Sequence, residues 1–360
     1  MNEIILLLIV ILLALAFEFI NGFHDTANAI ATSVATKVLT ARQAIILASI
    51  TNLIGALMGT EVAKTISSGI VDPSFVTVDL LITVLLAAII WNLITWWFGL
   101  PTSSSHALIG ALAGGALAIS GDNQSSIYWS IPSDKGWIYN QGIVWKVFVP
   151  MIISPLIGFI LAYILMRIVF LIIDRLGSKK LEPVMKKIQI LSASAMGYMH
   201  GTNDAQKTMG IISLALFLTA KKIDLNHLPE WLSFLIPNDQ AMIIPLWVKI
   251  VCAVIMAAGT SVGGWRIINT LGRKMSRIRP SQGFVAESSA ATIIGLSTGL
   301  GIPLSTTHNI TATILSVSYV RNPRGVRWNI AARIVWAWML TFPISAGFSY
   351  ILTKIYLIFN

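Results

Sequence analysis

Charged side chains are scarce in this chain. Only 11% of its 360 residues are Asp, Glu, Lys or Arg, whereas 56% are hydrophobic. Charged residues make up about 25% of an ordinary soluble domain. The composition therefore excludes a soluble fold and indicates an all-α polytopic membrane protein, in which the net charge of +10 belongs to loops beside apolar segments rather than to a nucleic-acid surface.

Cysteine is nearly absent, since Cys252 is the only one. A single thiol inside an apolar run rules out an internal disulfide and a cysteine metal cluster, so packing is its expected role. The N-terminus also lacks the basic region of a secretory signal peptide, and its apolar stretch continues into a polar motif. A cleaved signal peptide is not expected.

The chain is rich in long apolar segments. A membrane span needs about 20 helical residues, and ten segments are candidates, in two groups of five. Two of them, 4–36 and 188–218, exceed one span and carry Gly and Asn near the middle, so we expect each to be broken there. The ten segments are 4–36, 43–60, 78–98, 103–120, 143–173, 188–218, 241–262, 284–301, 303–319 and 328–357.

A carboxylate lies inside the first apolar segment, where Asp25 is part of the motif 21–29 (NGFHDTANA). An ionisable side chain at membrane depth costs roughly 2.5 kcal/mol or more unless it faces a partner or a water-filled cavity, so it marks a candidate functional site. The same design returns at 200–208 (HGTNDAQKT), with Asp204 in place of Asp25 at an offset of 179 residues.

Two further matches support an internal repeat. The sequence PTSSSH at 101–106 is matched by PLSTTH at 303–308, and GTEV at 59–62 by GTSV at 259–262. Three matches in the same order divide the chain into two similar halves. The predicted units are a first repeat at 1–175, a cytoplasmic linker at 176–187 and a second repeat at 188–360.

The basic residues predict how the halves are oriented. Seventeen of the 25 Lys and Arg residues fall in four stretches beside apolar segments, which the positive-inside rule assigns to the cytoplasm. Because each half has an odd number of segments, the halves have opposite topologies, and both termini are non-cytoplasmic. Inverted repeats with broken helices and hairpins that meet at the midplane are typical of secondary transporters. The stretches are 37–42, 167–187, 266–280 and 321–333.

The Pro-led motifs form the expected anion site. Pro101 and Pro303 each end one arm of a hairpin, and the following Ser/Thr run can cap the next helix. Helix N-termini attract anions, and the two tips should face each other because the hairpins enter from opposite sides. The candidate anion ligands are Thr26, Asn28, Ser104, Ser105, Gln206, Thr208, Thr306 and Thr307.

An anion between these tips would be repelled by Asp25 and Asp204. Na+, or protons on the carboxylates, would resolve this conflict and make entry of the anion depend on entry of the cation. We favour Na+ because the motifs supply neutral oxygens, while His24 keeps H+ open. The candidate Na+ ligands are Asp25, Asp204, Asn21 and Asn203, with His24, Lys207, Glu18 and Glu287 as secondary candidates.

Lys207 can instead be a local counter-charge, because it lies three residues after Asp204 on one helical face. Its repeat position in the first half is Asn28. Zinc is not indicated, since the chain has neither His-x-x-x-His nor Cys-x-x-Cys spacing.

The motifs GFHDTAN at 22–28 and GTNDAQK at 201–207, with the Pro-led tips, resemble the bacterial branch of the inorganic phosphate transporter (PiT) family. That family has a duplicated Gly-x-Asn-Asp-x-x-Asn motif, from which His24 and Lys207 depart. The resemblance implies a transporter in the cell inner membrane that imports inorganic phosphate with Na+ or H+ by alternating access, with both termini outside.

This assignment implies no enzyme activity and no cofactor beyond the coupling ion. The expected partners are phosphate, Na+ or H+ and the lipid bilayer, and a second copy of the chain is a candidate partner, whereas nucleic acid is not. A sulfate permease of related architecture is the nearest alternative. An ion channel would favour a continuous selectivity filter or rings of like charge, and the expected pair of broken helices speaks against it. An intramembrane enzyme is less well supported because no Ser/His/Asp order or metal motif is visible.

Overall fold

The computed structural model describes residues 2–223, 230–236 and 244–359. Within these ranges the chain is helical, with two isolated β-bridges and no strand. The α-helices are α1 (Asn2–Ala35), α2 (Ala41–Ala56), α3 (Glu61–Ser68), α4 (Val78–Trp97), α5 (Ser104–Ile119), α6 (Val149–Leu176), α7 (Ser178–Lys222), α8 (Leu246–Val262), α9 (Trp265–Asn269), α10 (Pro280–Gly299), α11 (Thr306–Arg321) and α12 (Trp328–Phe359).

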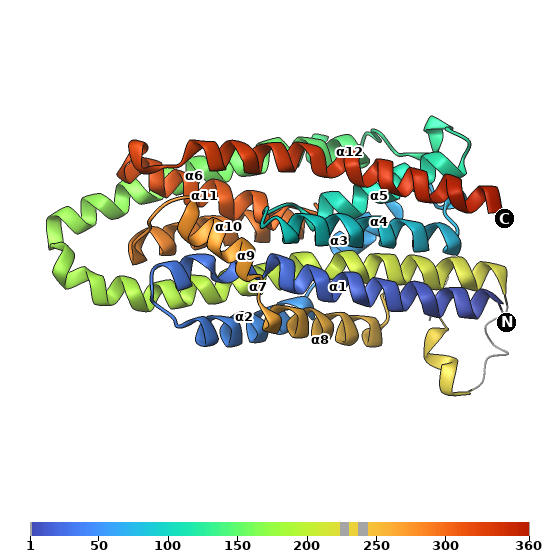
Figure 1. Ribbon diagram of the computed structural model, residues 1–360, viewed down its shortest axis with the longest axis horizontal. Coiled ribbons are helices and arrows are strands. Elements are labelled where there is room, and N and C mark those ends of the chain that lie inside the picture. Colours follow the sequence, from blue (N-terminus) through green and yellow to red (C-terminus); the bar gives the residue numbers. More distant parts are fainter. Residues whose placement is uncertain (1, 224–229, 237–243, 360) are drawn as a thin grey trace.

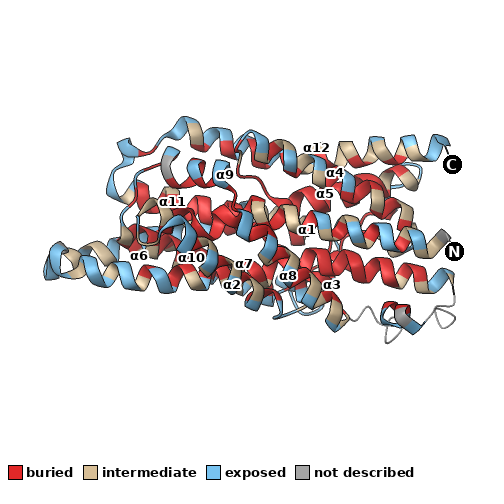
Figure 2. Ribbon diagram, turned by 60° about the horizontal axis from the view of Figure 1, so that its bottom comes forward, coloured by how far each residue is buried: buried red, intermediate tan, exposed pale blue. Residues whose placement is uncertain are grey.

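Several of these helices can cross a membrane. Among the described residues four are long and apolar enough, α1, α4, the segment that ends with α6, and α12, and the number rises to six if each of two bent helix pairs is one span. Large apolar side chains lie on the outside of α6 and α12, where Ile160 is 56% and Trp336 67% exposed. Figure 2 shows such exposed residues along the outer helices. The chain is a multi-pass membrane protein.

The two halves of the chain are arranged as inverted repeats. In Figure 1 α1 and α7 lie side by side and run in opposite directions through the middle of the molecule. Around them α1 packs against α8 as α7 packs against α2, and α5 packs against α12 as α11 packs against α6. Both chain ends lie at one end of the molecule, and the basic connections lie at the other (Figure 1).

The predicted breaks in 4–36 and 188–218 are wrong, because α1 and α7 are continuous helices. Their motif glycines serve close helix packing instead. A Cβ on Gly22 would lie 2.5 Å from the carbonyl oxygen of Met256 in α8, and a Cβ on Gly201 would lie 2.3 Å from the carbonyl oxygen of Asn52 in α2. The absence of a side chain lets the helices approach at these two crossings.

The breaks lie in the second span of each half. The axes of α2 and α3 differ by 69°, and α8 and the following helical segment differ by 57°. Gly59 (φ +80°) and Gly263 (φ +76°) occupy these breaks. Both have a backbone conformation that glycine adopts without steric cost.

The positions of these breaks show that the alignment of 59–62 with 259–262 must be shifted by four residues. Gly59 corresponds to Gly263 at the break, whereas Gly259 corresponds to Gly55 at a helix crossing. A Cβ on Gly55 would lie 2.1 Å from the carbonyl oxygen of Tyr198, and a Cβ on Gly259 would lie 2.2 Å from the carbonyl oxygen of Phe19. Phe19 and Tyr198 are equivalent positions of the two repeats.

The predicted linker 176–187 is largely helical, since α7 begins at Ser178 and continues through the second motif. The division of the chain at 175 and 188 stays a prediction. Part of the predicted segment 241–262 lies outside the described residues, and α8 begins at Leu246.

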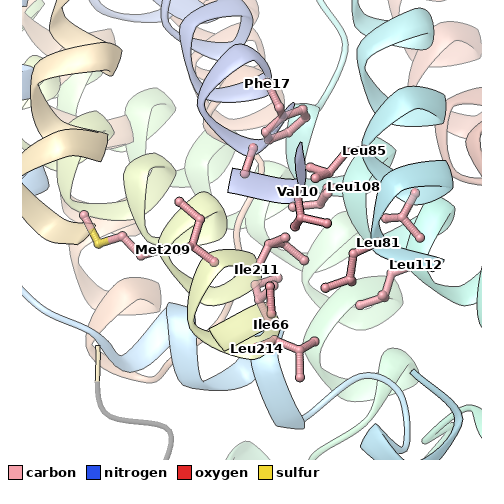
Figure 3. Packing of buried hydrophobic residues seen from close by; sticks show 14 of the residues in the cluster. Val10, Phe17, Ile66, Leu81, Leu85, Leu108, Leu112, Met209, Ile211 and Leu214 are labelled. Atoms are coloured by element: carbon pink, nitrogen blue, oxygen red, sulfur yellow. The ribbon is translucent and has the colours of Figure 1, made fainter. Parts of the chain in front are cut away.

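An apolar cluster lies on the side of the motifs that faces the chain termini. It includes side chains from α1, α3, α4, α5 and α7 that are fully buried or nearly so. Figure 3 shows how they meet, with Phe17 and Val10 of α1 facing Leu85 of α4 and Ile211 of α7. Van der Waals contacts among such closely packed side chains stabilise the association of these helices.

The orientation can be tested with single cysteines at exposed positions near the two ends of the molecule. We expect Ser130→Cys, at the end with the termini, to react with a membrane-impermeant thiol reagent from outside, and Lys180→Cys and Arg324→Cys only from inside. The native Cys252 is buried and should give little background. Outside labelling at Lys180→Cys would overturn the predicted orientation.

Candidate functional site

The two Pro-led motifs form capped helix N-termini, as predicted. The Ser103 hydroxyl accepts a hydrogen bond from the His106 amide at the start of α5, and Ser305 does the same for His308 at the start of α11. Helix geometry leaves the first backbone amides of α5 and α11 without intrahelical acceptors. Each tip therefore presents N–H donors and the positive end of a helix dipole.

The two tips touch each other. The Ser105 hydroxyl of α5 donates to the Leu304 carbonyl in front of α11, with an O···O distance of 3.2 Å. The rings of His106 and His308 meet edge to face, with centroids 4.9 Å apart. Two helix N-termini from opposite halves thus converge at one point inside the protein.

Asp25 of α1 lies at this point and is buried. Its Oδ1 is 2.7 Å from Nδ1 of His24, and its Oδ2 accepts a 3.0 Å bond from the Ser104 hydroxyl. The Thr307 hydroxyl is 3.4 Å from Oδ1. Both helix tips therefore contribute a hydroxyl to the Asp25 carboxylate.

Asp204 of α7 is fully buried beside it. The Asn203 amide donates to Oδ1 at 2.7 Å. Around Oδ2 lie Nζ of Lys207 at 3.1 Å, Nε2 of His200 at 3.3 Å and the Thr306 hydroxyl at 3.5 Å. Asp204 thus has a charged partner that Asp25 lacks.

The two carboxylates share one site. Ligand atoms of Asp25, Asp204 and His200 lie within 4.8 Å of one another, in an arrangement that could hold a metal ion. Two like charges about 4 Å apart repel by about 4 kcal/mol at an effective dielectric constant of about 20. A cation between the carboxylates would relieve this repulsion, and the assignment of Asp25 and Asp204 as Na+ ligands stays a prediction.

Not every predicted ligand faces this site. The Thr26 hydroxyl donates to the Gly22 and Thr260 carbonyls. Gln206 uses Oε1 to accept from the amides at the start of α3. Their assignment to the anion remains a prediction, and in the structure both residues join helices.

Thr208 and Asn21 lie beside Glu18 rather than beside the anion tips. The Thr208 hydroxyl donates to the Glu18 carboxylate. The fully buried Asn21 side chain lies beside the same carboxylate, three residues further along α1. These three residues form a separate polar group on the side of Asp25 nearer the N-terminus.

Glu287 of α10 belongs to another buried group, at the opposite side of the motifs. Its carboxylate accepts hydrogen bonds from Thr32 and Ser33 of α1 and from Gln189 and Ser192 of α7. The carboxylate thus joins three helices.

Sequence reasoning gave no role to two residues, Asn52 and Thr95, that hold the site in place. Asn52 of α2 contacts His200 at 3.0 Å and donates to the Thr260 hydroxyl at 3.0 Å. Thr95 of α4 lies 3.2 Å from Nε2 of His24. A polar residue inside an apolar run, as at Asn52, is the signal that could have found it.

The fold and site define a class of protein. Paired helix N-termini can bind an oxyanion, paired carboxylates can bind a cation, and the two lie together in the middle of a membrane protein built from inverted repeats. These are the parts of a membrane transporter for an anion, and not of an enzyme.

Residues 21–349 match the phosphate transporter family, and the chain belongs to that family. It is 45% identical over 345 residues to a probable low-affinity inorganic phosphate transporter of Bacillus subtilis, covering 95% of each chain. A relative of the same description from Rhizobium meliloti is 42% identical, over 95% of this chain and 93% of the relative.

A solved structure described as the sodium-dependent phosphate transporter has the same fold. It matches with a TM-score of 0.78 and 22% identity, over 99% of this chain and 100% of the other. The predicted family and fold class are confirmed.

Thr307→Val tests the α11 tip. The change removes a hydroxyl that lies near Asp25 and accepts a 2.9 Å bond from the Asn28 amide. A hydrogen bond to a charged group is worth about 1.5 to 3 kcal/mol, so the KM for phosphate uptake should rise at least about tenfold.

Thr311→Val is the matched control, because Thr311 lies one turn further along α11 and its buried hydroxyl has no partner among the described residues. An unchanged KM in Thr307→Val, measured in proteoliposomes, would exclude this tip from the anion site.

Proposed function

We propose that this protein imports inorganic phosphate by symport with a cation, Na+ in the first place and H+ as the alternative, through alternating access. The convergence of two helix N-termini on two buried carboxylates carries this proposal. The amides and hydroxyls of Ser104, Ser105, Thr306 and Thr307 would bind phosphate. Asp25 and Asp204 would bind the cation between them. Asn203 would support the cation ligands, and Asn28 would support the phosphate ligands.

The coupling follows from electrostatics. Without a cation, phosphate entering this site adds negative charge next to two carboxylates in a medium of low dielectric constant. Without phosphate, a cation entering this site adds positive charge next to the positive ends of two helix dipoles. Each ion therefore improves the site for the other, and linkage makes this coupling reciprocal.

Na+ is the first candidate because the site offers many neutral oxygens. Hydroxyls from both tips and the Asn side chains surround the carboxylates, as a hard cation requires. The solved structure with the same fold is described as sodium-dependent, which supports the same choice here. The short His24–Asp25 contact keeps H+ as the second candidate.

The remaining features of the proposal rest on the sequence. The positive-inside rule places the basic end of the molecule in the cytoplasm and both termini outside. Location in the cell inner membrane and assembly as a homodimer are part of the same proposal.

Phosphate and sulfate must be separated by experiment, because helix N-termini bind both oxyanions. In proteoliposomes, we expect excess arsenate, which matches phosphate in shape and protonation, to compete with labelled phosphate uptake, and sulfate to leave it nearly unchanged. Stronger competition by sulfate than by arsenate would favour the sulfate permease.

Asp25→Asn tests the coupling ion. The variant removes one negative charge from the cation site, so the Na+ concentration for half-maximal phosphate uptake should rise steeply while an imposed pH gradient has little effect. The flux is measured with one gradient at a time. The exposed carboxylate of α6 provides the control variant Asp174→Asn, which should behave like the wild type. Full wild-type activity in sodium-free buffer under a pH gradient would exclude Na+ as the coupling ion.

A further inference from the structure

The contacts of the two aspartates repeat almost one for one between the halves. His24 and Asn203 hold equivalent positions, and each places a side-chain nitrogen 2.7 Å from the Oδ1 atom of the following aspartate. The first residue of each tip helix places its hydroxyl next to the Oδ2 atom of one aspartate. Ser104 of α5 donates to Asp25 at 3.0 Å, and Thr306 of α11 donates to Asp204 at 3.5 Å.

The residue three positions after each aspartate continues this pattern. Asn28 donates to the Thr306 hydroxyl at 3.1 Å, across to the tip of α11. Lys207, its equivalent, donates to the Ser104 hydroxyl at 2.9 Å, across to the tip of α5. The two side chains thus make the same contact in the two halves, with the two hydroxyls that hold the aspartates.

Charge is where the halves differ. The Asn28 side chain is a neutral amide, whereas Lys207 is fully buried and brings its ammonium to 3.1 Å from Oδ2 of Asp204. An ammonium is a compact point charge with three donors, and its separation from this carboxylate is that of an ion pair. The side chain is anchored to α7, so this positive charge cannot leave with the substrate.

We infer that the Lys207 ammonium acts as a tethered cation beside Asp204. In the first half, the equivalent place beside Asp25 has no such charge and is left for a mobile coupling cation. The charge of Asp204 is then balanced permanently, so the negative charge that draws a cation from solution into the shared site is that of Asp25. Lys207 thereby lowers by one the number of coupling cations carried with each phosphate. This inference rests on the proposed cation symport.

Two other roles for Lys207 predict different behaviour. A direct phosphate ligand would set the affinity for phosphate and leave the number of cations unchanged. A purely structural ion pair would affect the amount of folded protein and leave both properties of the folded fraction unchanged. The number of coupling cations is therefore the quantity to measure.

Lys207→Asn, which installs the residue of the first half, is the test. Proteoliposomes are held at zero membrane potential, and the phosphate accumulation ratio at equilibrium is measured against the imposed cation ratio, for Na+ and H+ separately. The slope of the logarithms gives the number of coupling cations. We expect a slope one unit higher in Lys207→Asn than in the wild type, and the wild-type slope in Lys207→Arg, which keeps the charge.

A charge swap provides the matched control. Asn28→Lys combined with Lys207→Asn moves the tethered charge to the other half, and its slope should return to the wild-type value. A slope in Lys207→Asn equal to that of the wild type would overturn the inference, as would a raised slope in Lys207→Arg.

If Lys207→Asn does not transport phosphate, the number of coupling cations can be measured by a binding experiment, which requires no transport. Inorganic phosphate binding to the purified variant is titrated at several Na+ concentrations and pH values, and the steepness of its cation dependence should exceed that of the wild type by one ion. Folded Lys207→Asn protein that binds no phosphate under any condition, while Lys207→Arg binds it, would identify Lys207 as a phosphate ligand and refute the tethered cation.

The same experiments separate this inference from the proposed function. If the wild-type protein accumulates phosphate under neither a Na+ gradient nor a pH gradient, the proposed symport is refuted. If the wild type shows symport and the slope is unchanged in Lys207→Asn, only the proposed role of Lys207 is refuted.

Discussion

The repulsion between two buried carboxylates is the constraint on which the rest of the site depends. Asp25 and Asp204 come from different halves of the chain, and their ligand atoms lie within 4.8 Å in the interior of a membrane protein. Hydroxyls, an amide, imidazoles and one ammonium surround them. The helix N-termini of α5 and α11 add positive potential from both sides, and the same potential is what an oxyanion requires.

Close helix packing places these carboxylates together. The crossings of α1 with α8 and of α7 with α2 depend on Gly22 and Gly201, where a side chain would collide with a carbonyl oxygen of the neighbouring helix. Because Asp25 and Asp204 lie three residues further along, each crossing fixes the position of one carboxylate. Small residues at helix contacts are how membrane helices approach each other, and here that approach sets the geometry of the site.

Local patterns in the sequence predicted local structure well. A Pro followed by a Ser/Thr run was enough to predict the capped tips of α5 and α11, because a cap depends only on neighbours in the chain. The role of the motif glycines could not be predicted in this way. Gly22 could have marked a break or a packing contact, and the choice depends on Met256, more than 200 residues away. The partners of Gln206 and Thr208 are similarly distant in sequence, on α3 and α1.

The repeat is least exact on either side of the carboxylates, and this difference bears on alternating access. On the side of the basic loops, Thr32 and Ser33 donate to Glu287. Their repeat equivalents at the other side are Ile211, Ile212 and Leu85, which are fully buried in the apolar cluster of Figure 3. Opening the protein at Glu287 exchanges hydrogen bonds for bonds to water, which changes the free energy little. Opening it at Leu85, Ile211 and Ile212 exposes hydrophobic area to water at about 25 cal/mol per Å². Each side also has an apolar cluster and a buried carboxylate of its own, Glu18 on one side and Glu287 on the other. For a carrier that alternates access as proposed, these equivalent positions therefore contribute different free energies to opening on the two sides, although the motifs that bind the ions are repeated.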